Sequence, residues 1–396
     1  GRPVKPEIDG ANLDHVFTLW TLNDMDNIHR HIEEKSPKNA VVIGGGFIGL
    51  EMVEALVQRG LNVHLVEMMP HVMSVMDAET AGFIEQEMLS YGVNIHTGKG
   101  VTAISSKAVK LNDGTIINAE MVLMSIGVRP TLQLAKETEL EIGESGGLLV
   151  NEYLQTSDEH IYAAGDMIEV ENRVSGKKVR IPLAGPANRQ GRIAAENMLG
   201  GKHAYKGAMG TSILRVFESV AGITGLSLKQ ARALGIPSDA VVVHKEHHTS
   251  YYPGAENVSV MLVYNTETGE VLGGQTAGYK GADRRLDVIA SAIAGNLTIH
   301  DLADIDFAYS PPLGTANDAM NMAAFTAENK KSGFSNSITV GELDEWVKIN
   351  NPIVFEWQFQ SNANEEQVSY ELEYTLDKSL GTTTVVKKTT SDMIYT

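Results

Sequence analysis

The sequence lacks cysteine: none of its 396 residues is Cys. This absence excludes disulfide bonds, thiolate zinc and iron–sulfur sites, and a thiol nucleophile carried by the chain itself. Basic residues are also scarce, because 32 Lys and Arg stand against 50 Asp and Glu and give a net charge of −18. Nucleic-acid phosphates are bound by basic surfaces, so this balance argues against a nucleic-acid partner.

Long hydrophobic runs are also missing. No stretch approaches 18 continuous apolar residues, and residues 1–6 lack the apolar segment of a signal peptide. We therefore expect a cytoplasmic protein with no membrane partner. The first residue is Gly1, and the prolines near it are typical of a connector, so we expect the chain to begin inside a longer protein.

Glycine, in contrast, is abundant, with 38 residues. The most informative glycines follow residues 40–43, a wholly apolar run typical of a buried parallel strand. Residues 50–59 then have a helical pattern that ends at Gly60, and residues 61–67 have the pattern of a second strand. A strand, a glycine turn, a helix and a strand in this order predict a βαβ unit.

The glycines of this turn have the spacing of a dinucleotide fingerprint, with Gly44, Gly46 and Gly49 in the three positions. Gly44 would permit the tight turn, Gly46 the approach of a pyrophosphate to the backbone, and Gly49 the packing of helix against strand. Glu67 ends the next strand and would accept hydrogen bonds from the adenosine ribose. The alternative is a glycine turn that serves packing alone.

Glu67 also predicts which nicotinamide nucleotide is bound. A ribose 2′-phosphate would lie about 4 Å from its carboxylate, and the repulsion would reach about 4 kcal/mol at an effective dielectric constant near 20. We therefore expect NADH to be preferred over NADPH.

The rest of the chain continues as alternating helices and strands and then changes character. From residue 206 onward, hairpins and amphipathic helices predict an α+β domain with a largely antiparallel sheet. The segments expected before that point are a helix over 21–34, a helix over 78–90 capped by Asp77, a small β-meander over 101–117, strands over 121–126 and 161–164, and a helix over 186–199.

The histidines at 244, 247 and 248 raise the question of a metal site. On a strand, His244 and His248 would share one face while His247 pointed away, and no carboxylate pair stands nearby. We therefore expect no metal site here, and we interpret the segment as a polar strand end near the substrate or the subunit interface.

Several of these segments resemble those of a known family. Residues 41–51, Val-Val-Ile-Gly-Gly-Gly-Phe-Ile-Gly-Leu-Glu, resemble the NAD-binding motif of the flavin-dependent pyridine nucleotide–disulfide oxidoreductases. Residues 125–130, 161–166, and 182–184 with 188–192 resemble further motifs in the family order. The resemblance covers residues 1–325. It implies a glutathione-reductase-like fold of class α/β, with Rossmann-like FAD and NAD domains followed by an α+β dimerisation domain.

This resemblance also implies cofactor-binding residues. Ile48 and Glu51 would lie near the nicotinamide, and Asp166 would bind the ribityl chain of FAD. The remaining residues placed at the cofactors are Gly127, Gly165, Leu183 and Ala184. The implied domains are the NAD(H)-binding domain at 38–151, the remainder of an FAD-binding domain at 1–37 and 152–202, the dimerisation domain at 203–327, and a tail at 328–396.

The C-terminal half is similar to the coenzyme A-disulfide and persulfide reductase branch. The segments that carry this similarity are residues 248–254, His-Thr-Ser-Tyr-Tyr-Pro-Gly, and residues 307–312, Phe-Ala-Tyr-Ser-Pro-Pro. In that branch two tyrosines of one subunit enter the active site of the other. The resemblance assigns these roles to Tyr309 and Tyr251, with Tyr252 as the competing choice, and the alternative is that they pack an interface.

The chain departs from the family at both ends. Family members begin with a first glycine fingerprint for FAD and a helix with the redox cysteine, and this chain starts after both. Residues 338–346 resemble the entrance to a fused rhodanese domain, but the tail has no cysteine loop and is too short to complete one. We therefore expect the sequence to be an incomplete, inactive fragment of its enzyme.

The function predicted for the whole enzyme is FAD-dependent reduction of a coenzyme A disulfide or persulfide by NADH, in a homodimer. Coenzyme A would be the substrate or a ligand. An NADH oxidase or peroxidase of the same family is the first alternative. A non-catalytic NAD-binding scaffold, which the absence of cysteine favours, is the second.

Overall fold

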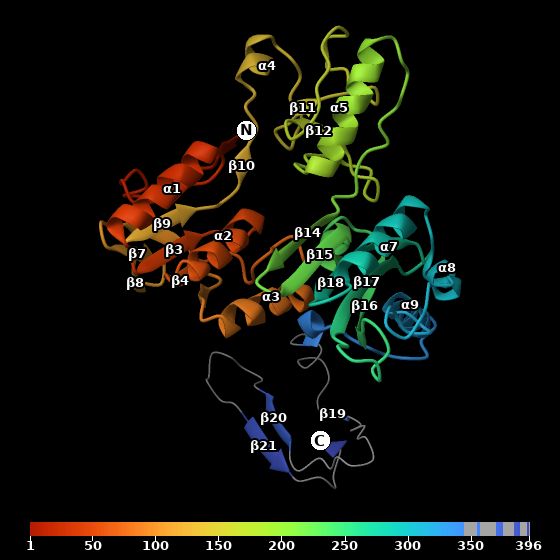
Figure 1. Ribbon diagram of the computed structural model, residues 1–396. Coiled ribbons are helices and arrows are strands. Elements are labelled where there is room, and N and C mark those ends of the chain that lie inside the picture. The colour runs from red at the N-terminus through yellow and green to blue at the C-terminus, as the bar shows by residue number, and fades with distance from the viewer. Residues whose placement is uncertain (344–354, 357–369, 375–383, 389–393, 396) are drawn as a thin grey trace. The chain divides into compact units, whose positions relative to one another are not determined.

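The computed structural model describes residues 1–343, 355–356, 370–374, 384–388 and 394–395. The chain divides into two units, residues 1–337 and 338–396, and each is described by itself (Figure 1). Among the described residues, no helix combines the length and the apolar character needed to cross a membrane.

The first part of the larger unit is a five-stranded parallel sheet in the order β2-β9-β3-β4-β5. The strand order and the helices between the strands confirm the predicted βαβ unit. We call this part of the chain the parallel-sheet domain. Its elements are β2 (Val16–Thr18), α1 (Leu22–Lys35), β3 (Asn39–Ile43), α2 (Phe47–Gln58), β4 (Asn62–Val66), α3 (Ala78–Ser90), β5 (Asn94–His96) and β9 (Met121–Met124), with the meander β6 (Val101–Ile104), β7 (Ala108–Leu111) and β8 (Ile116–Asn118).

A smaller segment with three short strands follows this domain. Its elements are β10 (Val128–Arg129), which pairs with β1 (Arg2–Pro3), α4 (Gln133–Glu137), the sheet of β11 (Leu148–Leu149), β12 (Ile168–Glu171) and β13 (Lys178–Val179), and α5 (Ala184–Met198). The strand predicted over 161–164 is wrong. The chain forms only an isolated β-bridge there, between Tyr162 and Gln155; the N–H of Ala163 donates to Leu154 beside this bridge, and that of Ile161 donates to Asp158 in a turn.

The last part is an antiparallel sheet in the order β14-β15-β18-β17-β16, which confirms the predicted α+β domain. We call it the antiparallel-sheet domain. Its elements are β14 (Ser212–Val216), β15 (Ser219–Gly225), α6 (Leu228–Ala233), β16 (Ser238–Glu246), β17 (Asn257–Asn265), β18 (Val271–Gly278), α7 (Ala282–Ala294), α8 (Ile299–Asp304) and α9 (Ala319–Lys331).

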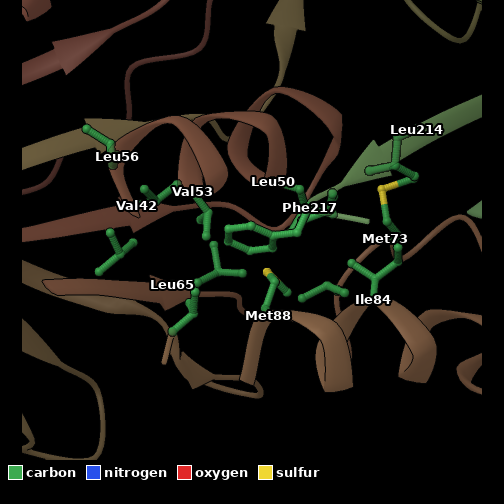
Figure 2. Close-up of a cluster of buried hydrophobic side chains, with 14 of the residues drawn as sticks. Val42, Leu50, Val53, Leu56, Leu65, Met73, Ile84, Met88, Leu214 and Phe217 are labelled. Atoms are coloured by element: carbon green, nitrogen blue, oxygen red, sulfur yellow. The ribbon is translucent and has the colours of Figure 1, made fainter. Parts of the chain in front are cut away.

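A single hydrophobic core joins the two sheets. Leu65, Ile84 and Met88 of the parallel-sheet domain belong to the same buried cluster as Leu214 and Phe217 of the antiparallel-sheet domain (Figure 2). Burying a side chain of this size contributes about 1.5–3 kcal/mol. The two domains therefore stabilise each other through shared apolar contacts.

Asp77 forms a polar contact across the same interface. It precedes α3 in the N-cap position, but its side chain makes no capping hydrogen bond to that helix. The carboxylate instead accepts the backbone N–H groups of Leu228 (2.8 Å) and Lys229 (3.3 Å) and the side-chain amide of Gln275 (2.6 Å). The predicted cap of α3 is wrong in this respect, because a buried carboxylate is satisfied here by the start of α6.

Two further carboxylates repeat this arrangement. Glu54 of α2 accepts the backbone N–H of Phe217 at 2.7 Å. Glu87 of α3 accepts the N–H of Glu218 at 2.9 Å and the hydroxyl of Tyr279 at 3.0 Å. Hydrogen bonds to charged acceptors contribute about 1.5–3 kcal/mol each, so these contacts fix the orientation of one domain against the other.

Two neighbouring histidines at the edge of the parallel sheet give a pH-dependent prediction. His64 Nδ1 lies 3.0 Å from His96 Nε2, and the rings are stacked. Burial lowers the pKa of both imidazoles. The charge of His96 lowers the pKa of His64 further, and the charge of Lys99 lowers the pKa of His96 further. In the unfolded chain these histidines have the ordinary pKa near 6.5, so they bind more protons than in the folded chain as the pH falls, and the folded state loses stability. We expect the urea midpoint of unfolding to fall between pH 7 and pH 5, and to fall less in His96→Asn.

The control for this titration is His160→Asn, because the side chain of His160 is 85% exposed. It should show the same loss of stability as the wild type over this pH range. An equal loss in His96→Asn and in the wild type would contradict a role for the histidine pair.

The smaller unit contains two antiparallel strand pairs. They are β19 (Phe355–Glu356) with β22 (Ile394–Tyr395), and β20 (Tyr370–Tyr374) with β21 (Thr384–Lys388). Residues 340–343 are helical. Residues 344–346, which end the segment that resembles the entrance to a rhodanese domain, lie outside the described residues, so that resemblance stays a prediction.

Candidate functional site

The glycine loop joins β3 to α2 in a conformation that depends on two of its glycines. Gly44 has φ +107°, and a Cβ there would lie 2.3 Å from the carbonyl oxygen of Ser125. A Cβ at Gly49 would lie 2.0 Å from the carbonyl oxygen of Gly44. The turn and the close packing of α2 on β3 therefore require the absence of side chains at both positions.

The N-terminus of α2 is open to a ligand. Gly46 is the N-cap residue, no side chain caps the helix, and a Cβ at Gly46 would meet nothing within 4 Å. The first N–H groups of a helix have no partner within it, and they carry the positive end of the helix dipole. This geometry fits the pyrophosphate of a dinucleotide.

The helix begins earlier than the sequence predicted. It starts at Phe47 rather than at residue 50, because the fingerprint's last glycine is itself helical. Ile48 is half-buried in the first turn, and Glu51 is exposed on the following turn. Both lie in the first two turns of α2, and their contacts with the nicotinamide stay a prediction.

Glu67 follows β4 and holds the glycine loop in place. One carboxylate oxygen accepts the backbone N–H of Gly45 at 2.7 Å, and the other accepts that of Met69 at 2.8 Å. Each carboxylate oxygen can accept a second hydrogen bond. Glu67 therefore combines support of the loop with spare acceptor capacity for ribose hydroxyls.

A second group of predicted residues surrounds a cavity of about 210 Å³. Asp166, Arg129 and Pro130 line it, whereas the predicted residues Gly127 and Gly165 do not. Gly165 has φ +85° and donates its N–H to Gln190 of α5 at 2.7 Å. The structure thus brings the segment after Gly127 next to the segment that ends at Asp166, although 36 residues separate Pro130 from Asp166.

Leu183 and Ala184 lie at a second open helix end. Leu183 is the N-cap residue of α5, Ala184 is its first residue, and no side chain caps the helix. Both line a cavity of about 620 Å³ together with Arg189 and Lys206. An electron-rich edge of a flavin fits such a helix end, because its N–H groups and dipole favour negative charge.

The tyrosines form a third group. Tyr251 and Tyr309 come from separate loops of the antiparallel-sheet domain, and a hydrogen bond with Tyr251 raises the pKa of Tyr309 above that of an ordinary phenol. Both side chains are exposed, at 74% and 48%. Tyr252 does not join this pair, because its ring lies edge-on to His248 with 5.7 Å between ring centres. The contacts therefore favour Tyr251 over Tyr252 as the partner of Tyr309.

The histidines at 244–248 do not share a strand face. His244 lies on β16, whereas His247 and His248 follow the end of that strand. His244 Nδ1 is 2.7 Å from Ser259 Oγ, and the other two rings contact backbone carbonyl oxygens. In the described part of the chain, no three His, Asp or Glu side chains are placed to hold a metal ion.

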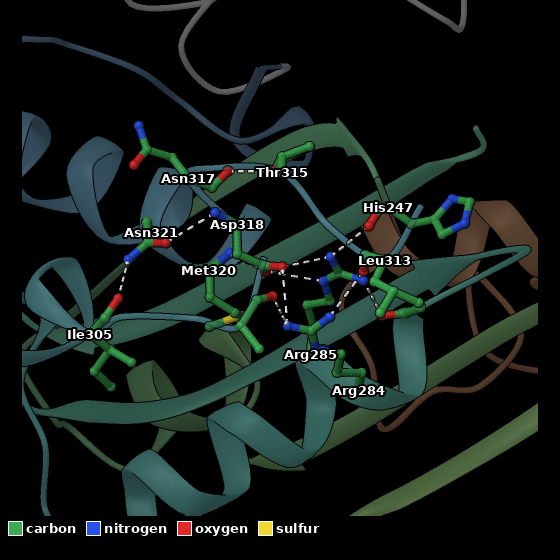
Figure 3. A network of polar contacts seen from close by, with 12 residues as sticks. His247, Arg284, Arg285, Ile305, Leu313, Thr315, Asn317, Asp318, Met320 and Asn321 are labelled. Atoms are coloured by element: carbon green, nitrogen blue, oxygen red, sulfur yellow. Dashed lines mark hydrogen bonds and ion pairs between the residues drawn. The ribbon is translucent and has the colours of Figure 1, made fainter. Parts of the chain in front are cut away.

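Sequence reasoning missed the polar network that holds the tyrosine loops. Arg285 and Asp318 form a buried ion pair with 2.6 Å between Nη2 and Oδ2, and Arg285 also donates to the carbonyl of His247 (Figure 3). The available signal was the position of Arg285 in a helix whose same face carries Ile289 and Ala292. A charged residue on an apolar face indicates a buried partner.

Comparisons with known proteins match two parts of this chain to one family. Residues 1–191 match the model of the pyridine nucleotide-disulphide oxidoreductases, and residues 214–320 match the dimerisation domain of the same family. The NADH oxidase of Methanocaldococcus jannaschii is 33% identical over 336 residues, which are 84% of this chain and 74% of that protein.

Two solved structures are similar in fold and sequence. The reduced Bacillus anthracis CoADR-RHD is 42% identical with a TM-score of 0.85, covering 88% of this chain and 63% of that one. The NAD-dependent persulfide reductase from A. fulgidus is 36% identical with a TM-score of 0.84, covering 86% of this chain and 64% of that one. This chain thus spans less than two thirds of either protein. The predicted fold class is confirmed, and the chain belongs to the pyridine nucleotide-disulphide oxidoreductase family.

Proposed function

We propose that this chain supplies the NADH-binding and dimerisation parts of an FAD-dependent reductase for coenzyme A disulfides or persulfides, working as a homodimer. The observation that carries the proposal is the open N-terminus of α2 beside Glu67. The names of the two similar structures and the dimerisation-domain match at residues 214–320 support the substrate class and the dimer.

The residues of the three groups have distinct roles in this proposal. Gly44, Gly46 and Gly49 shape the loop that binds the pyrophosphate, and Glu67 binds the adenosine ribose. Ile48 and Glu51 contact the nicotinamide. Asp166 and the N-terminus of α5 at Leu183 and Ala184, with Gly127 and Gly165 in the adjoining turns, bind FAD. When bound, the nicotinamide supplies a hydride and the flavin supplies an acceptor for it.

Tyr251 and Tyr309 contribute a proton donor for sulfur chemistry. A phenol donates its O–H to a thiolate or a departing sulfur and thereby stabilises the negative charge. The redox thiol of such a reaction is not among the 396 residues, which contain no cysteine. Disulfide reduction therefore depends on a cysteine that this sequence does not supply.

An NADH oxidase is the second candidate function. Its support is the 33% identity to the protein of that name. Anaerobic assays with a coenzyme A disulfide as acceptor, compared with aerobic assays without it, separate the two activities. Turnover that needs oxygen and ignores the disulfide would favour the oxidase.

Glu67 gives the direct test of nucleotide binding. We expect the chain to bind NADH more tightly than NADPH, because the 2′-phosphate would lie against the carboxylate. Glu67→Gln removes the charge and keeps an acceptor for the loop, and it should move the ratio of the two dissociation constants toward NADPH roughly tenfold or more, an effect of about 1.4 kcal/mol. Fluorescence titration of the purified chain with both nucleotides measures this ratio.

The matched control is Glu159→Gln, since the Glu159 side chain is 83% exposed and pairs only with the neighbouring His160 among the contacts described. It should leave the ratio unchanged. Tighter binding of NADPH by the wild type would refute the preference for NADH. Failure of the wild type to bind either nucleotide would refute the proposed function itself.

A further inference from the structure

The two loops that carry the tyrosines are joined directly to each other. The backbone N–H of Thr249 donates to the carbonyl oxygen of Gly314 at 3.0 Å. Its hydroxyl donates to the carbonyl oxygen of Pro311 at 2.8 Å. Thr249 lies two residues before Tyr251, and Pro311 lies two residues after Tyr309. One threonine therefore fixes the spacing of the two chain segments next to both phenols.

Helix α7 holds the second loop from the other side. Arg284 donates from Nη1 to the carbonyl oxygen of Leu313 at 3.2 Å and from Nη2 to that of Ala308 at 3.3 Å. Ala308 immediately precedes Tyr309. The planar guanidinium thus contacts the loop at two points that flank the tyrosine, a geometry that the point charge of a lysine does not reproduce.

Arg285 and Asp318 anchor the far ends of both loops. Arg285 donates to the carbonyl oxygen of His247 at 3.0 Å, where the first loop begins. It also donates through Nε and Nη2 to the two oxygens of Asp318, where the second loop ends (Figure 3). Asp318 caps α9 through the N–H of Met320. The first loop therefore starts, and the second loop ends, at the same buried ion pair of Arg285 and Asp318.

We propose that Thr249 and Arg284 are positioning residues, which hold Tyr251 and Tyr309 together as one hydrogen-bonded donor for the acceptor substrate. This inference rests on the proposed function and adds the device that sets its geometry. A pair of phenols has two hydroxyl protons. One is used between the rings, and the other remains for an electron-rich atom of a ligand, such as a thiolate sulfur.

The exposure of the tyrosines explains why such a device is needed. Tyr251 is 74% exposed and Tyr309 is 48% exposed, so packing alone does not fix either ring. A free tyrosine loses side-chain entropy on being ordered, and a loop ordered beforehand reduces that cost for the bound state. The backbone contacts of Thr249 and Arg284 supply this ordering while leaving the hydroxyls accessible.

The proposal is tested on the purified chain without cofactors, through the titration of Tyr309. The hydroxyl of Tyr309 is followed by NMR of ¹³Cζ-labelled tyrosine and assigned with Tyr309→Phe and Tyr251→Phe. Thr249→Val removes the hydrogen bond to Pro311, and we expect the pKa of Tyr309 to fall toward that of an ordinary phenol. Thr249→Ser keeps the hydroxyl and should restore the titration of the wild type.

Two further variants exclude a general effect on stability. Thr326→Val is the matched control, because Thr326 is also half-buried and its hydroxyl donates to the carbonyl oxygen of Met322 at 2.7 Å, within α9. It should leave the titration of Tyr309 unchanged. Arg284→Gln removes the contacts on either side of Tyr309 and should shift the titration in the same direction as Thr249→Val.

The outcomes separate the positioning role from the proposed function. A wild-type titration in Thr249→Val and in Arg284→Gln would overturn the positioning role, even in a chain that binds NADH. A lowered pKa in both variants supports it. If NADH fails to bind while these variants shift the titration, the proposed function is wrong and the pairing of the tyrosines stands.

Discussion

Replacing Gly49 by alanine is expected to lower the free energy of unfolding and to remove tight NADH binding. The added Cβ would lie 2.0 Å from the carbonyl oxygen of Gly44, and a backbone atom cannot move away as a flexible side chain can. Overpacking of this kind costs about 1–3 kcal/mol. Each N–H contact to a phosphate lost from the displaced loop weakens binding by about 1.5–3 kcal/mol, which is roughly 10- to 160-fold.

Gly46→Ala separates these two effects. A Cβ at Gly46 meets nothing within 4 Å, and the residue has φ −88°, so alanine fits the free protein. We expect its urea midpoint to match the wild type while NADH binding weakens, because the methyl group would occupy the space of the pyrophosphate. Unchanged stability and affinity in Gly49→Ala would show that the loop does not have the geometry described.

Arg285→Met is expected to destabilise the antiparallel-sheet domain by about 3–5 kcal/mol, because it leaves a buried carboxylate without its cation. Asp318 would keep the N–H of Met320 and a longer ion pair with Arg284, at 4.0 Å, and the carbonyl oxygens of Gly281 and His247 would lose this donor. The side chains of Arg285 and Asp318 are only 2% and 3% exposed, so water does not replace the lost contacts. Urea unfolding followed by far-UV circular dichroism measures the change.

A double variant distinguishes a buried charge from lost packing. Asp318→Asn keeps an oxygen for the N–H of Met320 and removes the negative charge. The combination of Arg285→Met with Asp318→Asn should be more stable than Arg285→Met alone, since no uncompensated charge remains. Arg59→Met is the control, because that side chain is 48% exposed and pairs with an exposed Glu33, and it should cost below about 1 kcal/mol. A double variant less stable than Arg285→Met would contradict this account.

The parts of the site that depend on neighbouring residues were predictable from the sequence. The glycine loop, its strand and its helix form within residues 39–67, and the steric needs of Gly44 and Gly49 follow from the spacing of the motif. The antiparallel hairpin of β17 and β18 was predictable for the same reason, because two strand-forming runs flank a short turn at residues 266–269. Local conformation and hydrophobic pattern were sufficient in these segments.

The remaining features depend on partners far along the chain. Asp77 had the pattern of a helix cap, yet its carboxylate binds Leu228 and Gln275, which lie more than 150 residues away. Residues 161–164 had the composition of a buried strand, but they form only one isolated bridge, beside which the N–H of Ala163 donates to Leu154. A single sequence gives propensities for such segments and does not identify which distant group satisfies a buried polar atom.

The shared core beneath the two sheets has a consequence for the modular history of this protein. The motifs of the NAD-binding segment predicted at 38–151 suggest a self-contained module. Its helices α2 and α3, however, place apolar and carboxylate side chains against β14, β15 and the start of α6. A foreign NAD-binding module exchanged for it would have to reproduce Glu54, Asp77 and Glu87 as acceptors for that surface. An exchange of sequence at the motif boundaries would therefore separate residues that depend on one another.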